Sequence, residues 1–314
     1  SEMIEGLYGR AAPASLVAQI HRATGGNAFF AKSLFQHLAE EGELFDADGE
    51  WREDLDRREL PIPDGIRFVI ERRLGRLGDD TVGVLSAAAV EGLRFDLRTL
   101  ERALDEVAKG EAAVEAGAVL TAVEAAEKAG LVFAVGDERD ARYEFAHALV
   151  RQALLDDLSA GRRQRLHRRL GLALESVHGE APAHAADIAY HYYRAGDQVD
   201  KQRTLRFLVL SGERALETAA ADEAVQAFSR ALELEEGEAA RAELLFQRGL
   251  AHRTAGDVVR SGEDWLEALP VFERAPNPER VAEICWAQGY IYAWDNKMLK
   301  AEQLVRRGLA VVGE

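Results

Sequence analysis

The chain has 314 residues, of which 47% are hydrophobic and 30% charged, with a net charge of −16 and a pI near 5.1. This length suits two or three folded domains, and so negative a chain disfavours direct binding to nucleic-acid phosphates. The single cysteine, Cys285, excludes an internal disulfide, and no apolar run approaches the roughly 18 residues of a membrane span. We therefore expect a cytoplasmic protein without a membrane partner. Because Ala, Leu, Glu and Arg dominate, we expect a mainly α-helical fold.

Residues 1–60 are predicted to contain two helices and a polar loop. Apolar residues at helical spacing form two stripes, over residues 16–23 and 29–44, and Gly25-Gly26-Asn27 separates them. The chain starts at Ser1 rather than at a methionine, so we expect further domains upstream.

Residues 61–178 carry the pattern of a winged helix followed by further helices. Helical stripes cover residues 64–77, 82–90, 95–107 and 113–129, and β-like runs over 131–135 and 141–145 flank a turn. Helices followed by one β-hairpin are the plan of a winged helix. The turn, residues 136–140, carries three acids and one base, so we interpret this domain as a packing module rather than a DNA-binding one. The predicted boundary to the last domain is residues 179–182.

Residues 183–314 predict helix pairs joined by short turns. Three of these turns contain Asp222, Asp257 and Asp295, which are 35 and 38 residues apart. A period in the mid-thirties is typical of tetratricopeptide-like repeats, although the usual Trp and Pro landmarks are mostly missing. A helical bundle without repeats is the alternative.

Two short stretches point to a family. Residues 20–30 read Ile-His-Arg-Ala-Thr-Gly-Gly-Asn-Ala-Phe-Phe, and residues 143–150 read Tyr-Glu-Phe-Ala-His-Ala-Leu-Val. They resemble the lid and the winged helix of bacterial signal-transduction ATPases with numerous domains, regulators related to LuxR-type activators and to multidomain adenylate cyclases. The resemblance is strong over residues 15–235 and weaker beyond.

This resemblance implies a nucleotide-controlled switch. In the family, an AAA-type P-loop domain binds ATP or ADP, the lid and winged helix close over the nucleotide, and a repeat domain senses a protein partner or a small-molecule inducer. The chain itself contains no Gly-x-x-x-x-Gly-Lys-Ser/Thr loop and no Walker B strand. We therefore predict a regulatory and interaction fragment of a transcriptional regulator that has no cofactor or enzyme activity of its own and relays signals to the ATPase and effector parts. The alternative is a free-standing repeat scaffold that binds proteins without nucleotide control.

The resemblance also assigns three nucleotide-sensing positions. The family's lid motif is Gly-Asn-Pro, and here Asn27 is followed by Ala28, which offers adenine a smaller contact. The family's Met-His-Asp motif reads the β-phosphate of ADP, and His147 stands in the corresponding Phe-Ala-His-Ala segment. The other interpretation, which we favour for the isolated chain, is a histidine that caps or packs the helix after the hairpin.

Basic residues and residues able to bind a metal give only weak evidence for a functional site. Arg162, Arg165 and Arg169 share one helix face and could contact phosphates or a partner, but a solvated face is the favoured interpretation. His184 and His191 lie two turns apart on a predicted helix, too far for one metal ion, so we predict no metal site. No nucleophile–base set suggests catalysis, and Cys285 fits an apolar helix core.

Aromatic residues near the C-terminus suggest a recognition surface. The cluster is predicted from Trp265, Trp286, Tyr290, Tyr292 and Trp294, because aromatic side chains anchor many interfaces. The alternative is that they form the core of the repeats.

Overall fold

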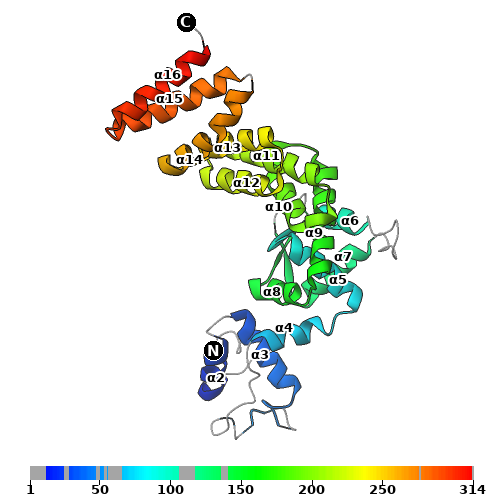
Figure 1. Ribbon diagram of the computed structural model, residues 1–314. Coiled ribbons are helices and arrows are strands. Elements are labelled where there is room, and N and C mark those ends of the chain that lie inside the picture. Colours follow the sequence, from blue (N-terminus) through cyan, green and yellow to red (C-terminus); the bar gives the residue numbers. More distant parts are fainter. Residues whose placement is uncertain are drawn as a thin grey trace. The chain divides into compact units, whose positions relative to one another are not determined.

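The computed structural model describes residues 12–24, 28–46, 50–52, 55, 66–105, 117–135, 141–275 and 277–312 (Figure 1). Within these residues the fold is mainly helical, as predicted, and contains one small antiparallel sheet of three strands. The contacts divide the chain into two compact units, Ser1–Arg163 and Gln164–Glu314. The division falls inside a long helix, earlier than residues 179–182, where we predicted the boundary.

The first unit begins with two helices that share a small core. They are α2 (Ala14–Thr24) and α3 (Ala28–Glu40), and they confirm the two helices predicted from the apolar stripes. Leu16 and Ile20 from α2 pack with Leu34, Phe35 and Leu38 from α3. The predicted break at residues 25–27 lies outside the described residues.

The rest of the first unit is a helical cluster around the small sheet. Its helices are α4 (Ile66–Leu74), α5 (Asp79–Glu91), α6 (Leu97–Asp105), α7 (Ala118–Lys128) and α8 (Ala148–Asp156). Its strands are β1 (Arg94–Asp96), β2 (Val132–Val135) and β3 (Arg142–Phe145). Helix α5 packs against both α7 and α8. Its consecutive buried alanines, Ala87–Ala89, leave room for close helix approach.

The sheet has the order β1-β3-β2 and is antiparallel throughout. Strands β2 and β3 are those of the predicted hairpin, whose turn at residues 136–140 lies outside the described residues. Strand β1 was not predicted, because we assigned Phe95 to a helix. The Phe95 ring packs 5.8 Å from the Tyr143 ring and 5.4 Å from the Phe145 ring. Pairing with β3, a tertiary contact, makes this short segment a strand.

From α10 onward the second unit is a succession of helices, each packed against the next (Figure 1). After α9 (Ala160–His178) come α10 (Ala185–Ala195), α11 (Lys201–Glu217), α12 (Ala221–Leu234), α13 (Glu238–Thr254), α14 (Val258–Arg274), α15 (Pro278–Trp294) and α16 (Met298–Val312). Short 3₁₀ turns, Pro182–His184 and Gly196–Gln198, bracket α10. The predicted helix pairs are therefore present, and Asp222 lies in the first turn of α12 rather than in a connecting turn.

The same glycine contact recurs in three consecutive helix pairs. A Cβ added to Gly212 on α11 would lie 2.6 Å from the Phe228 ring on α12, and one on Gly249 would lie 2.5 Å from the Trp265 ring on α14. The contact returns between α15 and α16, where a Cβ on Gly289 would lie 3.1 Å from Val305. In every pair the partner follows the glycine by sixteen residues, and the pairs repeat at intervals of 37 and 40 residues. A missing side chain on the first helix thus leaves room for the facing side chain on the second, which is aromatic in two of the three pairs.

Candidate functional site

His147 caps helix α8. Its backbone is extended, with φ −156° and ψ 146°, and its Nδ1 accepts a hydrogen bond from the Leu149 backbone N–H at 3.1 Å. An N-cap side chain satisfies one of the donors that a helix start leaves unpaired. With Nδ1 as the acceptor in this cap, Nε2 is the ring atom left to donate. The capping role that we weighed for His147 is therefore present, and nucleotide sensing stays a prediction.

The second of the two predicted lid positions belongs to α3. Asn27 lies outside the described residues, and Ala28 is the first residue of α3. Their contact with adenine also stays a prediction.

A hollow of about 590 Å³ lies beside the predicted lid helix. Residues from α3, α4 and α7 and from the turns that follow them line it, and Arg73 connects all three helical segments. The Arg73 guanidinium donates to the Ala129 carbonyl at 3.2 Å and to the Gln36 side-chain oxygen at 2.9 Å. Burial lowers the pKa of Arg73, with a further contribution from the nearby charge of Arg76.

The chemistry of this hollow is mixed, with more cations than anions. Arg73, Arg76 and Lys128 are on its lining, together with the carboxylate of Glu40, which pairs with Arg76 at 3.2 Å. Such a lining suits a polar or anionic group. These residues come from three separate elements and match no local motif, so they were not predicted from the sequence.

The predicted arginine face lies on α9. Arg162 and Arg165 are exposed and Arg169 is half-buried. Their contact with phosphates or a partner stays a prediction.

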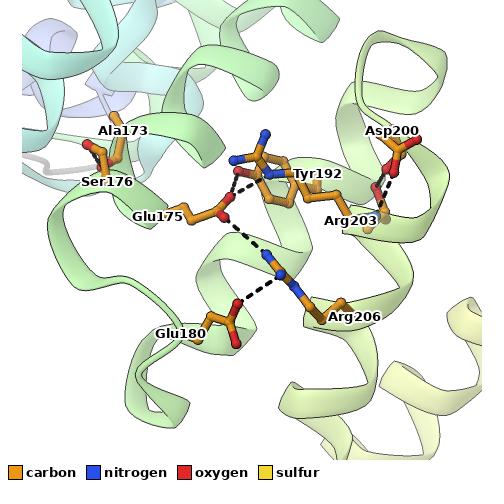
Figure 2. Close-up of polar contacts among 9 residues, drawn as sticks. Ala173, Glu175, Ser176, Glu180, Tyr192, Asp200, Arg203 and Arg206 are labelled. Carbon is orange, nitrogen blue, oxygen red and sulfur yellow. Dashed lines mark hydrogen bonds and ion pairs between the residues drawn. The ribbon is translucent and has the colours of Figure 1, made fainter.

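A half-buried carboxylate joins three helices at the start of the second unit (Figure 2). Glu175 on α9 accepts hydrogen bonds from the Tyr192 hydroxyl, from Arg203 Nε at 2.8 Å and from Arg206 at 3.2 Å. Burial by itself raises the pKa of Glu175, but the hydrogen bonds from Arg203 and Tyr192 outweigh it and lower the pKa below its ordinary value. Arg206 also pairs with the exposed Glu180 at 2.8 Å. This cluster, which the sequence analysis missed, fixes α9, α10 and α11 against one another.

The histidines that we weighed as metal ligands have other contacts. His191 is buried, and its Nδ1 lies 3.0 Å from Nδ1 of the buried His167. The His184 ring stacks on His178 with 3.6 Å between ring centres. Within the described ranges, no group of three or more His, Cys, Asp or Glu side chains is placed to hold a metal ion.

The predicted aromatic surface is divided between core and solvent. Trp265 is only 1% exposed, and its indole N–H donates to the Phe246 carbonyl at 3.1 Å. Trp265 is therefore core and was wrongly included in the surface, because the space at Gly249 admits its ring between α13 and α14. Tyr292 is partly buried against the same core. Trp286, Tyr290 and Trp294 are exposed, Trp286 by 68%.

Cys285 is buried, as predicted, and burial raises the pKa of its thiol. None of the helices that the structure describes is both long and apolar enough to cross a membrane.

Comparison of the chain with models of protein families, with curated proteins and with solved structures gave no match.

Proposed function

We propose that this chain is the relay and partner-binding part of a nucleotide-controlled signalling switch of the transcriptional-regulator type. The first unit would supply the lid helices and a winged helix, and the second a tetratricopeptide-like arm. The observation that carries the proposal is the glycine contact that recurs in three helix pairs. The proposal also includes ATP or ADP bound by a P-loop domain outside this chain.

The small residues of the second unit support the assignment to tetratricopeptide-like repeats. Counted from the glycines at 212, 249 and 289, the residue twelve positions later is always small, and so is the residue nineteen positions later. These residues are Ala224, Ser261 and Ala301, then Ala231, Ala268 and Gly308. Small side chains at fixed places in each pair allow the two helices to approach closely, and their recurrence in every pair supports a repeat.

The order of elements in the first unit supports a winged helix. The sequence α5-β1-α6-α7-β2-β3, with β1 beside β3, is the plan of that module. The exposed face of α7, which would be the DNA-reading helix, carries Glu124 and Glu127. Carboxylates at these positions repel phosphates, which favours a packing and relay role over DNA binding.

The proposed mechanism is a shift between conformational states. Nucleotide on the P-loop domain would favour one arrangement of lid and winged helix, and a partner on the arm would favour another. His147 would donate its Nε2–H to a phosphate while its Nδ1 caps α8. The cation-rich hollow lined by α3, α4 and α7 supports a polar contact between the lid helices and the winged helix.

The test is nucleotide retention by the complete gene product. We expect a P-loop in the coding sequence upstream of Ser1, ADP bound to the purified protein, and at least tenfold less ADP after His147→Ala or His147→Asn. Asn is a good N-cap, so His147→Asn keeps the cap and removes only the imidazole. Full ADP retention by His147→Asn would contradict sensing by His147. A coding sequence without a P-loop would contradict the switch and favour the free-standing scaffold.

A further inference from the structure

The solvent side of helix α9 carries a row of arginines. Arg162, Arg165 and Arg168 are exposed and Arg169 is half-buried, and we call these four residues the arginine row. At 1.5 Å per residue the row is about 10 Å long, which is two turns of the helix. Residues 160–174 of α9 contain no acid, so the helix itself does not offset the positive charge of the row.

Three arginines of the row also have no acidic partner on other elements. Among the residues that the structure describes, no carboxylate lies within 4.0 Å of Arg162, Arg165 or Arg168. Other arginines of the second unit do pair with carboxylates, and these are Arg203, Arg206, Arg214, Arg248, Arg260, Arg274, Arg280, Arg306 and Arg307. The row is therefore a local concentration of positive charge in a chain that has an excess of acids.

The row begins where a helix disfavours positive charge. The first turn of α9 contains Arg162 and Arg163 and no acid. Because the start of a helix bears a partial positive charge, acids are favoured there and arginines are disfavoured. Helices α10, α12, α13 and α15 each have an acid in the first turn. Helix stability does not account for arginines at the start of α9, and residues that break a local rule are expected at functional sites.

The opposite side of α9 is fixed against α10. His167 Nδ1 lies 3.0 Å from His191 Nδ1, and a Cβ added to Gly171 would lie 2.6 Å from the Tyr192 ring. These contacts hold the backbone of α9, so the arginines project from a fixed support. A support that is already ordered lowers the entropy cost of binding.

We propose that the arginine row binds an acidic helical segment of a partner protein. Carboxylates at intervals of three and four residues lie on one side of a helix, which matches the spacing of Arg162, Arg165 and Arg169. Guanidinium and carboxylate groups form charge-assisted hydrogen bonds, often in pairs. The inference rests on the partner-binding role in the proposed function, and it names a site and a class of partner for that role.

The charge of the rest of the chain favours a short acidic segment over nucleic acid. Residues 162–169 contain five arginines and no acid, and removing these five charges from the net −16 leaves −21 for the other residues. A nucleic-acid duplex is longer than the row and would meet that negative charge, whereas a segment of two helical turns contacts the row alone. Exposed charges are largely screened beyond about 8 Å at physiological salt, so a short segment is shielded from the remaining acids.

The probe for this site is a designed acidic helix. It is a labelled peptide with three repeats of Glu-Gln-Ala-Glu-Gln-Ala-Ala, which places its glutamates on one side. Its binding to the full chain is measured by fluorescence anisotropy at about 50 mM salt, where screening is weak. We expect saturable binding, and at least tenfold weaker binding of a peptide in which glutamine replaces every glutamate. A peptide of the same composition with glutamates all around the helix should bind at least threefold more weakly.

Variants of the chain locate the binding site. The double variant Arg165→Gln, Arg168→Gln should weaken peptide binding at least fivefold, and both side chains are exposed, so the fold should tolerate the change. The matched control is Arg260→Gln, Arg306→Gln, which removes the same charge from side chains that are 69% and 77% exposed. The control should weaken binding less than twofold.

Four outcomes would overturn the inference. They are no saturable binding of the acidic peptide, equal binding of the two acidic peptides, and equal losses from the two double variants. The fourth is tighter binding of a labelled DNA duplex of about 20 base pairs than of the peptide, since nucleic acid would then be the occupant. All four are measured on this chain and are independent of nucleotide retention in the complete gene product, so they can be told apart from failure of the proposed function.

Discussion

The Nδ1 atoms of His167 and His191 lie 3.0 Å apart between α9 and α10, and both side chains are buried. One ring must donate and the other accept, so the pair requires at least one neutral imidazole. Burial, with the charge of His167 as a second cause, lowers the pKa of His191 to about 3. The fold therefore favours neutral His191.

This pair makes stability depend on pH in a defined window. The folded-state pKa of His191 is below the ordinary 6.5, so the folded chain holds this histidine neutral where the unfolded chain would protonate it. The stability associated with neutral His191 is therefore complete above pH 6.5 and is lost as pH falls toward 3. We expect the free energy of unfolding to fall by about 1.4 kcal/mol per pH unit from this group within the window. Urea unfolding at pH 7.5, 6.5 and 5.5 measures the slope. His191→Gln should flatten it, and an unchanged slope would contradict the assignment.

Gly249→Ala should destabilise the second unit. The added methyl group would meet the Trp265 ring, which is fixed by its hydrogen bond to the Phe246 carbonyl. Overpacking of this kind costs about 1–3 kcal/mol. Thermal unfolding followed by circular dichroism gives the change.

The control for this substitution is a helical glycine with open space. Gly83 on α5 has no atom within 4 Å of an added Cβ. Gly83→Ala should stabilise the chain by about 0.5–1 kcal/mol through helix propensity. Equal effects at the two glycines would show that the contact with Trp265 does not restrict position 249.

Glu175→Gln should loosen the contacts among α9, α10 and α11. The substitution removes the charge that Arg203 and Arg206 share, at a site where the carboxylate is mostly buried. Because both guanidinium groups are partly exposed, we expect a loss of only about 1–2 kcal/mol in urea unfolding. Glu180→Gln is the control, since Glu180 pairs with Arg206 at the surface and should change stability by less than about 0.5 kcal/mol.

The same substitution has a spectroscopic consequence at Tyr192. Burial raises the pKa of the Tyr192 phenol, and the hydrogen bond and charge of Glu175 raise it further. Glu175→Gln should therefore lower the Tyr192 pKa, which phenolate absorbance measures during alkaline titration. A Tyr192 titration identical to that of the parent chain would contradict this coupling.

Iodide quenching should separate the tryptophans. Trp286 and Trp294 are 68% and 76% exposed, whereas Trp265 is 1% exposed. The double variant Trp286→Phe, Trp294→Phe should lose most of the quenchable fluorescence, and Trp265→Phe should keep it. Strong quenching that disappears only with Trp265→Phe would contradict the buried position of that side chain.

Local patterns were sufficient for most helices and for the hairpin strands. The stripe at Leu16 and Ile20 and the turn after α7 depend on residues within a few positions of each other. At that turn Gly130 has φ +68°, a conformation that glycine adopts without strain. Such signals need no knowledge of distant partners, so they can be read from the sequence.

Strand β1 and the cation-rich hollow could not be predicted in this way. Phe95 becomes part of a strand only because β3, nearly fifty residues later, provides backbone partners and two aromatic rings. Arg73 is held at the hollow by hydrogen bonds to Gln36 and Ala129, which belong to other elements. Neither arrangement leaves a periodic trace in the local sequence.

The sequence by itself determined the helical class, the hairpin strands and the spacing of the helix pairs, because residue propensity and apolar periodicity act over short distances. The tertiary structure decided which aromatic side chains of the helix pairs are buried and which are exposed to solvent. Trp265 and Trp286 are the same residue type on neighbouring helices, yet one is core and the other is open to solvent. Gly249 makes room for the Trp265 ring between α13 and α14. Trp286 stands forty residues after Phe246, whose ring lies against Arg280 of the next helix.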